Sequence, residues 1–339
     1  MSVILDRFRM TNNPDKCNAI THSGTFHGDE VMATAILIHF CCTPAGHKRF
    51  PEGLRLFRGT DEDVSRFKGR LVYDIGGGEY DHHDKNHMEY RENNVPYASC
   101  GLIWRRFGGP VSEAWGINPS MIDKNICEGI DARDNGVTIR NTATLGLSSE
   151  NVNIAPLTFS DIVFSMNPNY TEPRNKEYSN AMFASAVEMA ARILDRELQK
   201  LSAANAAKEY LQHYIIEAAE SPNPDILVMD VFIPWKAALL KFKDVYAENI
   251  KAVIYESPRE GYQWMLAPVK INSFETRVNC PEYLKGLRKD DLVKLGYHDG
   301  LFVHPTGFTG GAGSIETCIR MLRDIIDYKK PMYEGENVK

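Results

Sequence analysis

Residues 18–40 have the sequence NAITHSGTFHGDEVMATAILIHF, and this stretch decides the fold of the first half of the chain. Residues 18–23 predict a strand followed by a turn. Residues 29–40 predict a helix, because acidic residues open it and apolar residues recur at helical spacing. The residues that carry this pattern are Asp29, Glu30, Val31, Ala35, Leu37 and Ile38. The stretch therefore predicts a strand–turn–helix unit.

Further strands and helices alternate downstream. Residues 71–75 are apolar apart from Asp74 and precede Gly76-Gly77-Gly78, which predicts a buried strand and then a loop. Residues 99–107 and 119–132 predict helices. Alternation at this spacing favours an α/β fold with a parallel sheet, and ligands of such sheets gather at the carboxyl ends of the strands.

The second half of the chain predicts a separate α/β domain. Residues 145–175 are rich in Asn, Pro, Ser and Thr and predict a long connection, and residues 178–220 predict one or two helices. Strands are expected at 226–232, 252–255, 264–271 and 301–304, a glycine-rich loop at 307–313 and a helix at 315–326. We expect domains at 17–175 and 225–328, joined by a helical linker at 176–224.

Composition narrows the class of protein. The 339 residues carry a formal net charge of −6, so any attraction for nucleic acid must be local, through a basic cleft or bound cations. Seven scattered cysteines without a CxxC pair indicate reduced thiols. No apolar run reaches the ~18 residues of a membrane span, and no secretory signal opens the chain. We expect an intracellular protein of the cytoplasm, nucleus or mitochondrion.

Side chains that bind metals concentrate in four short segments near predicted strand ends. They are 22–29 with His22, His27 and Asp29; Asp74; 81–84 with Asp81, His82, His83 and Asp84; and 131–136 with Asp131 and Asp134. Carboxylates and imidazoles bind Mn²⁺, Mg²⁺ or Zn²⁺, and a carboxylate can bridge two such ions. Each segment alone has an ordinary explanation; Asp74, for example, could be a helix cap or turn former. Their conjunction predicts two divalent cations, with Mn²⁺ favoured and Mg²⁺ the alternative.

The run Asp81-His82-His83 resembles the signature of the DHH phosphoesterase superfamily. The chain is more closely similar to the Myg-one family of that superfamily, in four segments that occur in order between residues 17 and 326. These segments are Thr21 to Glu30 (THSGTFHGDE), Tyr80 to His83 (YDHH), Asp131 to Gly136 (DARDNG) and Phe302 to Gly311 (FVHPTGFTGG). The resemblance implies a DHH-type phosphoesterase with a catalytic first domain and a smaller substrate-binding second domain.

The resemblance also implies roles for individual residues. His22, His27 and Asp29 would share two metal ions, although the superfamily has an Asp where His27 stands. Asp74 would bridge the ions, and His82 would bind the second one. His83 would contact the phosphate, and Asp81 would orient a histidine. Asp131 or Asp134 would complete the second ion, and the sequence leaves that choice open because both lie on one helix face.

The second domain offers candidate substrate contacts. The glycine-rich loop with Gly310, Gly311 and Gly313 would present backbone N–H groups to phosphate before a helix that begins near Ser314, although a plain strand-to-helix turn would have the same glycines. His304 is a substrate ligand or a strand-end core residue. The cations of Arg259, Lys270 and Arg277 are further phosphate candidates without a spacing rule behind them.

Three functions remain open at this point. The leading hypothesis is a metal-dependent phosphodiesterase, a 3′–5′ exonuclease that acts on single-stranded RNA or short oligonucleotides with a water molecule activated by two metal ions. The second is a small-molecule phosphatase or pyrophosphatase that uses the same residues. The third is a non-catalytic regulator that retains the fold. A homo-oligomer is compatible with each of them.

Overall fold

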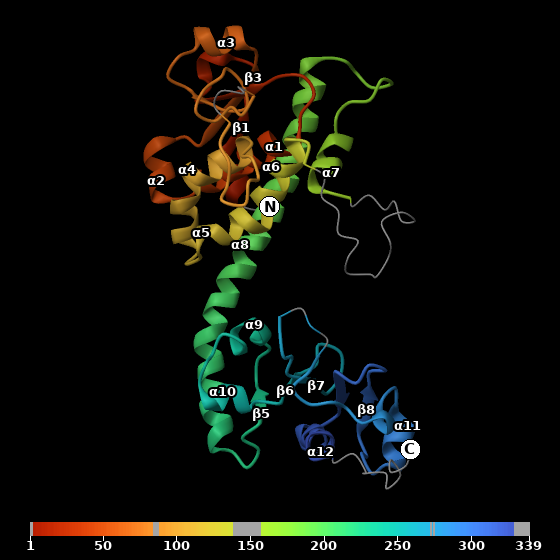
Figure 1. The fold of residues 1–339 in the computed structure, drawn as a ribbon. Coiled ribbons are helices and arrows are strands. Elements are labelled where there is room, and N and C mark those ends of the chain that lie inside the picture. The colour runs from red at the N-terminus through yellow and green to blue at the C-terminus, as the bar shows by residue number, and fades with distance from the viewer. Residues whose placement is uncertain (1–2, 84–87, 138–156, 272, 274, 329–339) are drawn as a thin grey trace, which may run out of the picture. The chain divides into compact units, whose positions relative to one another are not determined.

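A computed structural model of the chain describes residues 3–83, 88–137, 157–271, 273 and 275–328 (Figure 1). Contacts divide the chain into two compact units, Met1–Ser202 and Ala203–Lys339. The division falls inside α8 (Lys176–Glu220), a single 45-residue helix. None of the described helices combines the length and the apolar character that would let it cross a membrane.

The first unit contains a four-stranded parallel sheet in the order β1-β3-β2-β4, which confirms the predicted parallel α/β arrangement. Its strands are β1 (Phe8–Met10), β2 (Ala19–His22), β3 (Leu54–Gly59) and β4 (Leu71–Val72). Its helices up to β4 are the 3₁₀ helices η1 (Val3–Arg7) and η2 (Pro14–Lys16), then α1 (Gly28–Cys41), α2 (Pro44–Arg49) and α3 (Asp61–Arg66).

The strand predicted at 71–75 is shorter than expected. The backbone N–H of Tyr73 still donates to the Ile20 carbonyl of β2 at 3.2 Å, but Asp74 adopts a positive φ of 58° and turns the chain out of the sheet. Asp is one of the few residues that visit this left-handed region. The carboxyl ends of β2 and β4 therefore lie side by side, with His22 and Asp74 at them.

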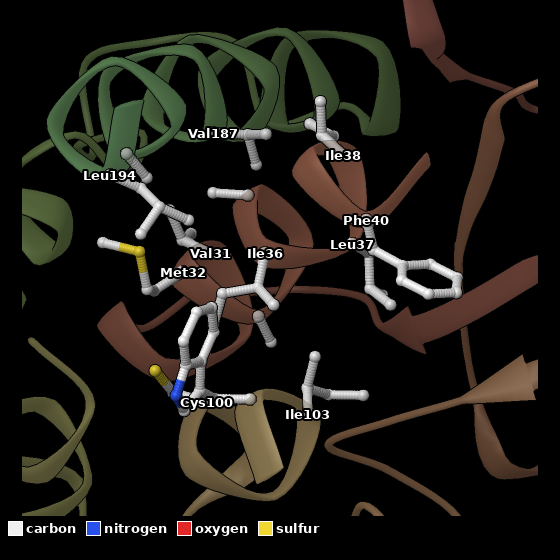
Figure 2. Packing of buried hydrophobic residues seen from close by; sticks show 14 of the residues in the cluster. Val31, Met32, Ile36, Leu37, Ile38, Phe40, Cys100, Ile103, Val187 and Leu194 are labelled. Atoms are coloured by element: carbon white, nitrogen blue, oxygen red, sulfur yellow. The ribbon is translucent and has the colours of Figure 1, made fainter. Parts of the chain in front are cut away.

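Helix α1 lies at the centre of the first unit. All fourteen of its residues are buried, so the apolar residues at helical spacing form only part of its buried surface. The run Ala33 to Ile38 is apolar on every side apart from Thr34, which suits a helix covered all round. Figure 2 shows α1 between Val187 and Leu194 of α8 on one side and Cys100 and Ile103 of α4 (Ser99–Ala114) on the other.

The helix predicted at 119–132 forms three consecutive pieces. They are α5 (Pro119–Ile122), the π-helical turn η3 (Asp123–Cys127) and α6 (Glu128–Asp134). The predicted connection at 145–175 lies partly outside the described residues, and its described part contains a helix that was not predicted, α7 (Phe159–Ser165). A capping box between Thr158 and Asp161 begins this helix.

The second unit contains a five-stranded mixed sheet in the order β5-β6-β7-β9-β8. Its strands are β5 (Ile226–Met229), β6 (Ala252–Glu256), β7 (Tyr262–Leu266), β8 (Gly300–Val303) and β9 (Thr309–Ala312). Its helices are α9 (Trp235–Leu239), α10 (Val245–Asn249), the 3₁₀ helix η5 (Glu282–Leu284), α11 (Lys289–Lys294) and α12 (Ile315–Ile326). Residues of α8 contribute to the cores of both units: Leu194 and Leu198 to the first, Leu211 and Ile215 to the second.

The glycine-rich loop predicted at 307–313 is instead largely a strand. β9 lies between β7 and β8 and pairs antiparallel with both. A Cβ on Gly310 would lie 2.4 Å from Cζ2 of Trp264 and 2.6 Å from the Phe302 carbonyl oxygen, so only glycine fits there. Two neighbouring strands and a buried tryptophan, not a ligand, explain the glycine at this position.

Candidate metal centre

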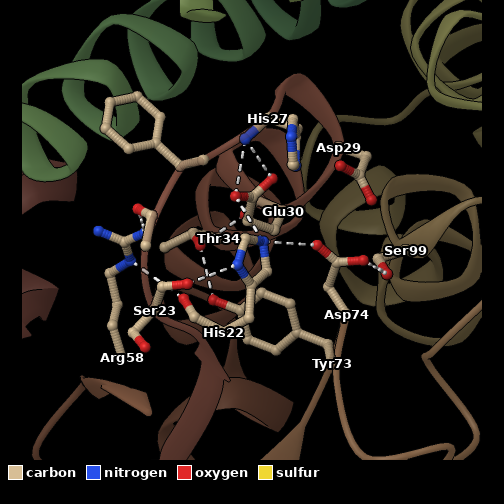
Figure 3. A network of polar contacts seen from close by, with 12 residues as sticks. His22, Ser23, His27, Asp29, Glu30, Thr34, Arg58, Tyr73, Asp74 and Ser99 are labelled. Carbon is tan, nitrogen blue, oxygen red and sulfur yellow. Dashed lines mark hydrogen bonds and ion pairs between the residues drawn. The ribbon is translucent and has the colours of Figure 1, made fainter. Parts of the chain in front are cut away.

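Five segments of the first unit converge at the carboxyl ends of β2 and β4. His22 ends β2, Asp74 follows β4, and Asp29 and Glu30 lie in the first turn of α1 (Figure 3). His82 comes from the loop after β4, and Asp134 ends α6. The topology thus brings together residues that are more than one hundred positions apart in the sequence.

The His22 ring joins two of the buried carboxylates. Its Nδ1 donates to the Ser23 carbonyl at 3.1 Å, and its Nε2 lies 3.0 Å from Oε1 of Glu30 and 3.1 Å from Oδ2 of Asp74. Burial lowers the pKa of His22, but hydrogen bonds to Asp74 and Glu30 outweigh that effect and raise it to about 10. The His22 ring is thus held between the carboxylates of Glu30 and Asp74.

Asp74 is held by contacts on both carboxylate oxygens. Besides the Oδ2 contact with His22, Oδ1 accepts a hydrogen bond from the Ser99 hydroxyl at 3.0 Å. Nδ1 of His82 lies 3.5 Å from the same Oδ1. The backbone N–H of Asp74 donates to the Tyr80 carbonyl at 2.9 Å, which fixes its positive-φ turn. The backbone turn at Asp74 thus holds its carboxylate in a fixed position in the cluster.

Asp29 gives the clearest indication that the cluster suits a cation. Its side chain is 1% exposed, and neither carboxylate oxygen has a hydrogen-bond partner among the described residues. Burial, together with the neighbouring charges of Asp74, Glu30 and Asp134, raises the pKa of Asp29 well above its ordinary range. Nδ1 of His82 is likewise buried without a hydrogen-bond partner. Buried polar atoms are nearly always paired, so these fit the ligand atoms of a bound metal ion.

The two aspartates of α6 have different surroundings. Oδ2 of Asp134 lies 2.8 Å from Nε2 of His82, so Asp134 belongs to the cluster. Asp131 is fully buried, and its oxygens are occupied by Nη2 of Arg91 at 2.8 Å and by the backbone N–H of Gly101 at 3.0 Å. The structure thus places Asp134, and not Asp131, among the candidate ligands.

Asp81 and His83 form a pair at the edge of the cluster. Oδ1 of Asp81 accepts hydrogen bonds from Nδ1 of His83 at 2.7 Å and from the His83 backbone N–H at 3.1 Å, while Oδ2 accepts from the Gly77 N–H at 2.8 Å. The side chain of His83 is 64% exposed. Asp81 therefore orients a histidine that faces solvent. Asp84, the fourth member of the predicted segment, lies outside the described residues.

Glu30 is a site residue that the sequence interpretation did not single out as a ligand. Its buried carboxylate accepts the backbone N–H of His27 at 2.8 and 2.9 Å and also faces His22. An acidic residue three positions after the helix cap was a visible signal of the first of these contacts. The buried Arg58 supports the same loop, because its guanidinium donates to the carbonyls of His22 and Gly24.

The donor set fits divalent cations. Four overlapping groups have ligand atoms that all lie within 4.8 Å of one another: Asp74, Asp81, His82 and His83; His22, His27 and Glu30; His27, Asp29 and Asp134; and Asp29, Glu30 and Asp74. Only carboxylates and imidazoles take part, which suits Mn²⁺, Mg²⁺ or Zn²⁺. His27 is exposed, so one side of the cluster is open to solvent.

The candidate residues of the second unit are engaged in structural contacts. Nη1 of Arg277 donates to the carbonyls of Ala247, Glu248 and Ile250 at the end of α10. The backbone N–H of Gly313 donates to the Asp299 carbonyl at 2.8 Å, and Gly311 lies inside β9. Nη1 of Arg277 and the backbone N–H of Gly313 are therefore already occupied by carbonyl groups of the chain.

Three other predicted contacts of the second unit lie in loops. His304 is held by Thr306, whose hydroxyl lies 2.8 Å from its Nδ1. The backbone N–H of Arg259 donates to the Ser257 hydroxyl in the turn between β6 and β7. Lys270 lines a pocket together with Lys236 and Phe308.

Comparisons with known proteins agree with the motifs. Residues 18–326 match the family model MYG1_exonuc, described as an uncharacterised protein family (UPF0160). The chain is 29% identical to a MYG1 protein of Schizosaccharomyces pombe over 334 residues, which is 91% of this chain and 97% of the relative. It is 26% identical to the MYG1 exonuclease of Homo sapiens, over 89% of this chain and 84% of the relative. No solved structure matches. Because the family model covers nearly the whole sequence, the chain belongs to the MYG1 family.

Proposed function

We propose that this chain is a divalent-metal-dependent phosphodiester hydrolase of the DHH type, a 3′–5′ exonuclease that acts on RNA. The observation that carries the proposal is the buried carboxylate of Asp29, which has no hydrogen-bond partner and lies among histidines and further carboxylates. Membership of a family whose mammalian members are named exonucleases supports a hydrolase.

Two ions, Mn²⁺ in preference to Mg²⁺, would be held by six residues that belong to overlapping groups. These are His22, His27, Asp29, Asp74, His82 and Asp134. Asp29 and Asp74 each occur in two groups, so either carboxylate can be shared between two ions. The histidines favour Mn²⁺, because imidazole is a softer ligand than the all-oxygen sets that Mg²⁺ prefers.

When bound, the cations would supply positive charge for the phosphate and lower the pKa of the attacking water molecule. The residues of the chain supply orientation. Asp81 accepts the Nδ1 proton of His83 and leaves Nε2 for a phosphate oxygen. Ser99 fixes the rotamer of Asp74, and Glu30 together with the Ser23 carbonyl fixes the ring of His22. The ligands would thus be held in position by their neighbours before a cation binds.

An intracellular place of action is part of the proposal. All seven cysteines are free thiols, and six of them are buried. Unpaired cysteines in this number suit a reducing compartment. The net charge of −6 means that an RNA substrate would be attracted by the bound cations and by local basic residues, not by the surface as a whole.

Metal binding is the first test of the proposal. Isothermal titration of Mn²⁺ into metal-free protein should show saturable binding, and Asp29→Asn should weaken it by at least about tenfold. Asp131→Asn is the matched variant, since Asp131 is buried nearby but occupied by Arg91, and its Mn²⁺ affinity should stay near that of the wild type. Absence of Mn²⁺ binding by the wild type would support the non-catalytic reading instead.

Hydrolysis is the second arm of this test. With Mn²⁺, the wild type should shorten single-stranded RNA labelled at its 5′ end in single-nucleotide steps, as a 3′–5′ exonuclease does. Asp74→Ala should lower the rate by roughly a hundredfold or more, and exposed Asp61→Asn should not. Intact RNA across a series of metal ions would refute the nuclease. Release of phosphate from pyrophosphate alone would identify a small-molecule phosphatase.

A further inference from the structure

A hollow lies in the first unit beside the loop that joins β2 to α1. One wall is formed by Gly24 and Thr25, which stand between the candidate ligands His22 and His27 in the sequence. The other wall comes from the segment between α7 and α8 and includes Tyr170 and Arg174. The space measures about 430 Å³, which lies within the range of small-molecule sites. We call it the Tyr170 pocket.

Hydrogen bonds link the two walls of the pocket. The side-chain amide of Asn167 donates to the Phe26 carbonyl at 2.8 Å, and its oxygen accepts the Phe26 N–H at 2.8 Å. The guanidinium of Arg58 bridges the Gly24 carbonyl, at 2.7 Å, and the Ser179 hydroxyl, at 3.2 Å. The pocket therefore keeps a fixed position relative to the loop that carries His22 and His27.

The side chains of the pocket combine an aromatic ring with a free cation. Tyr170 is 83% exposed, so most of its ring is accessible to a ligand. Arg174 is exposed and forms no ion pair with any residue that the structure describes. The nearby carboxylate of Glu172 is occupied by the Tyr178 hydroxyl and the Asn169 N–H. At Gly24, with φ of 93°, the side-chain position faces open space, so the loop does not fill the hollow.

We propose that the Tyr170 pocket binds one nucleotide of a single-stranded nucleic acid next to the metal centre. The base stacks on the Tyr170 ring, and the adjoining phosphate pairs with the Arg174 guanidinium. Stacking on an aromatic ring and contact of the backbone with a cation are the two elements of single-strand binding that tolerate any sequence. The inference rests on the proposed function, and it names the feature of the substrate that this unit recognises.

The test measures binding separately from hydrolysis. Fluorescence anisotropy of a short labelled single-stranded RNA is followed with the full chain in EDTA and in Ca²⁺. Tyr170→Ala should weaken binding roughly 5- to 150-fold, and Tyr170→Phe, which keeps the ring, should bind like the wild type. Arg174→Gln should weaken binding. It should also lower the slope of the logarithm of the binding constant against the logarithm of the salt concentration by about one, as the loss of one phosphate contact predicts. For RNA hydrolysis in Mn²⁺, both Tyr170→Ala and Arg174→Gln should raise KM and leave kcat unchanged.

Matched controls are Tyr210→Ala, which removes another exposed tyrosine, and Arg196→Gln, which removes another exposed arginine; neither should change binding. Wild-type affinity in Tyr170→Ala, or an equal loss in Tyr210→Ala, overturns the inference. If the wild type hydrolyses no RNA, but Tyr170→Ala loses RNA binding and Tyr210→Ala does not, the pocket is supported and the proposed reaction is refuted. If RNA is hydrolysed with KM unchanged in Tyr170→Ala and Arg174→Gln, the reaction stands and the pocket fails.

Discussion

At the scale of single residues, Arg91 decides which aspartate of α6 is free for a metal. Its guanidinium lies 2.8 Å from Asp131 and 2.7 Å from Asp123, and its charge lies over the Tyr97 ring at 4.0 Å from the centroid. Arg91 thereby pairs with Asp131. Asp134, three residues later, faces His82 instead. Removal of Arg91 would leave the Asp131 carboxylate without a partner in an interior that cannot solvate its charge. The loss of this pair is therefore expected to be costly in stability.

Arg91→Met should destabilise the protein by about 3–5 kcal/mol near pH 8 and by less near pH 5. Burial raises the pKa of Asp131 to about 7, although Arg91 opposes the shift. Because this pKa lies above the ordinary value of 3.8, the stability that comes from protonated Asp131 is present at low pH and lost as pH rises through 7. Without Arg91 the pKa rises further, so the loss grows with pH. Urea denaturation at both pH values measures it.

The control for this variant is Arg105→Met. Arg105 also lies over Tyr97, at 5.0 Å, but its ion pair with Glu89 is about half exposed. Its removal should cost no more than about 1 kcal/mol, with little difference between the two pH values. Equal losses in both variants, or a larger loss for Arg91→Met at pH 5, would contradict the account of Asp131.

The sequence predicted the residue types of the site and their place at strand ends. It did not predict which of these residues pair with other side chains and which are available to a metal ion. Asp131 and Asp134 share a helix face, so spacing cannot separate them. What separates them is Arg91, which stands in a stretch without any periodic pattern. Glu30 was missed as a partner of His22 because a carboxylate in the first turn of a helix is already explained by capping.

At the scale of elements, the glycines near the end of the chain were misinterpreted. A run of glycines before a helix predicts a phosphate loop, yet β9 is an inner strand of the sheet. The distinction depends on Trp264 of β7, which lies against Gly310 from more than forty residues away in the sequence. A contact of that kind has no signal in the local sequence. Helix α1, in contrast, was predicted almost to the residue, since its pattern is local.

Gly310→Ala should destabilise the second unit by about 1–3 kcal/mol, because the added methyl group would overlap the Trp264 ring and the Phe302 carbonyl. Guanidinium denaturation followed by tryptophan fluorescence measures the change. Gly129→Ala is the control: Gly129 lies in α6 with open space at its side-chain position, so alanine should raise stability by about 0.5–1 kcal/mol. Unchanged stability of Gly310→Ala with a loss of RNA binding would restore the phosphate-loop interpretation.

At the scale of the whole molecule, the chemistry is concentrated in one of the two units. Every candidate metal group among the described residues lies within Met1–Ser202. The boundary between the units falls inside α8, at a point where the sequence shows neither Gly nor Pro. The sequence predicted the helical stretch 176–224 as the linker between two domains. The position of the boundary within that stretch was not predicted, because helix periodicity persists on both sides of it.

This division predicts how Mn²⁺ acts on stability. A ligand that binds only the folded first unit should raise its stability by about 2.7 kcal/mol at a free concentration one hundred times Kd, and leave the second unit unchanged. Differential scanning calorimetry in EDTA and in Mn²⁺ should therefore show one transition that moves to higher temperature and one that does not. Asp29→Asn should reduce the shift by about half or more, in line with Mn²⁺ binding that is at least about tenfold weaker. It should not lower the transition temperature in EDTA, because it removes a buried carboxyl group that has no hydrogen-bond partner among the described residues. An equal shift of the whole thermogram in Mn²⁺ would instead show that the two units unfold as one cooperative body.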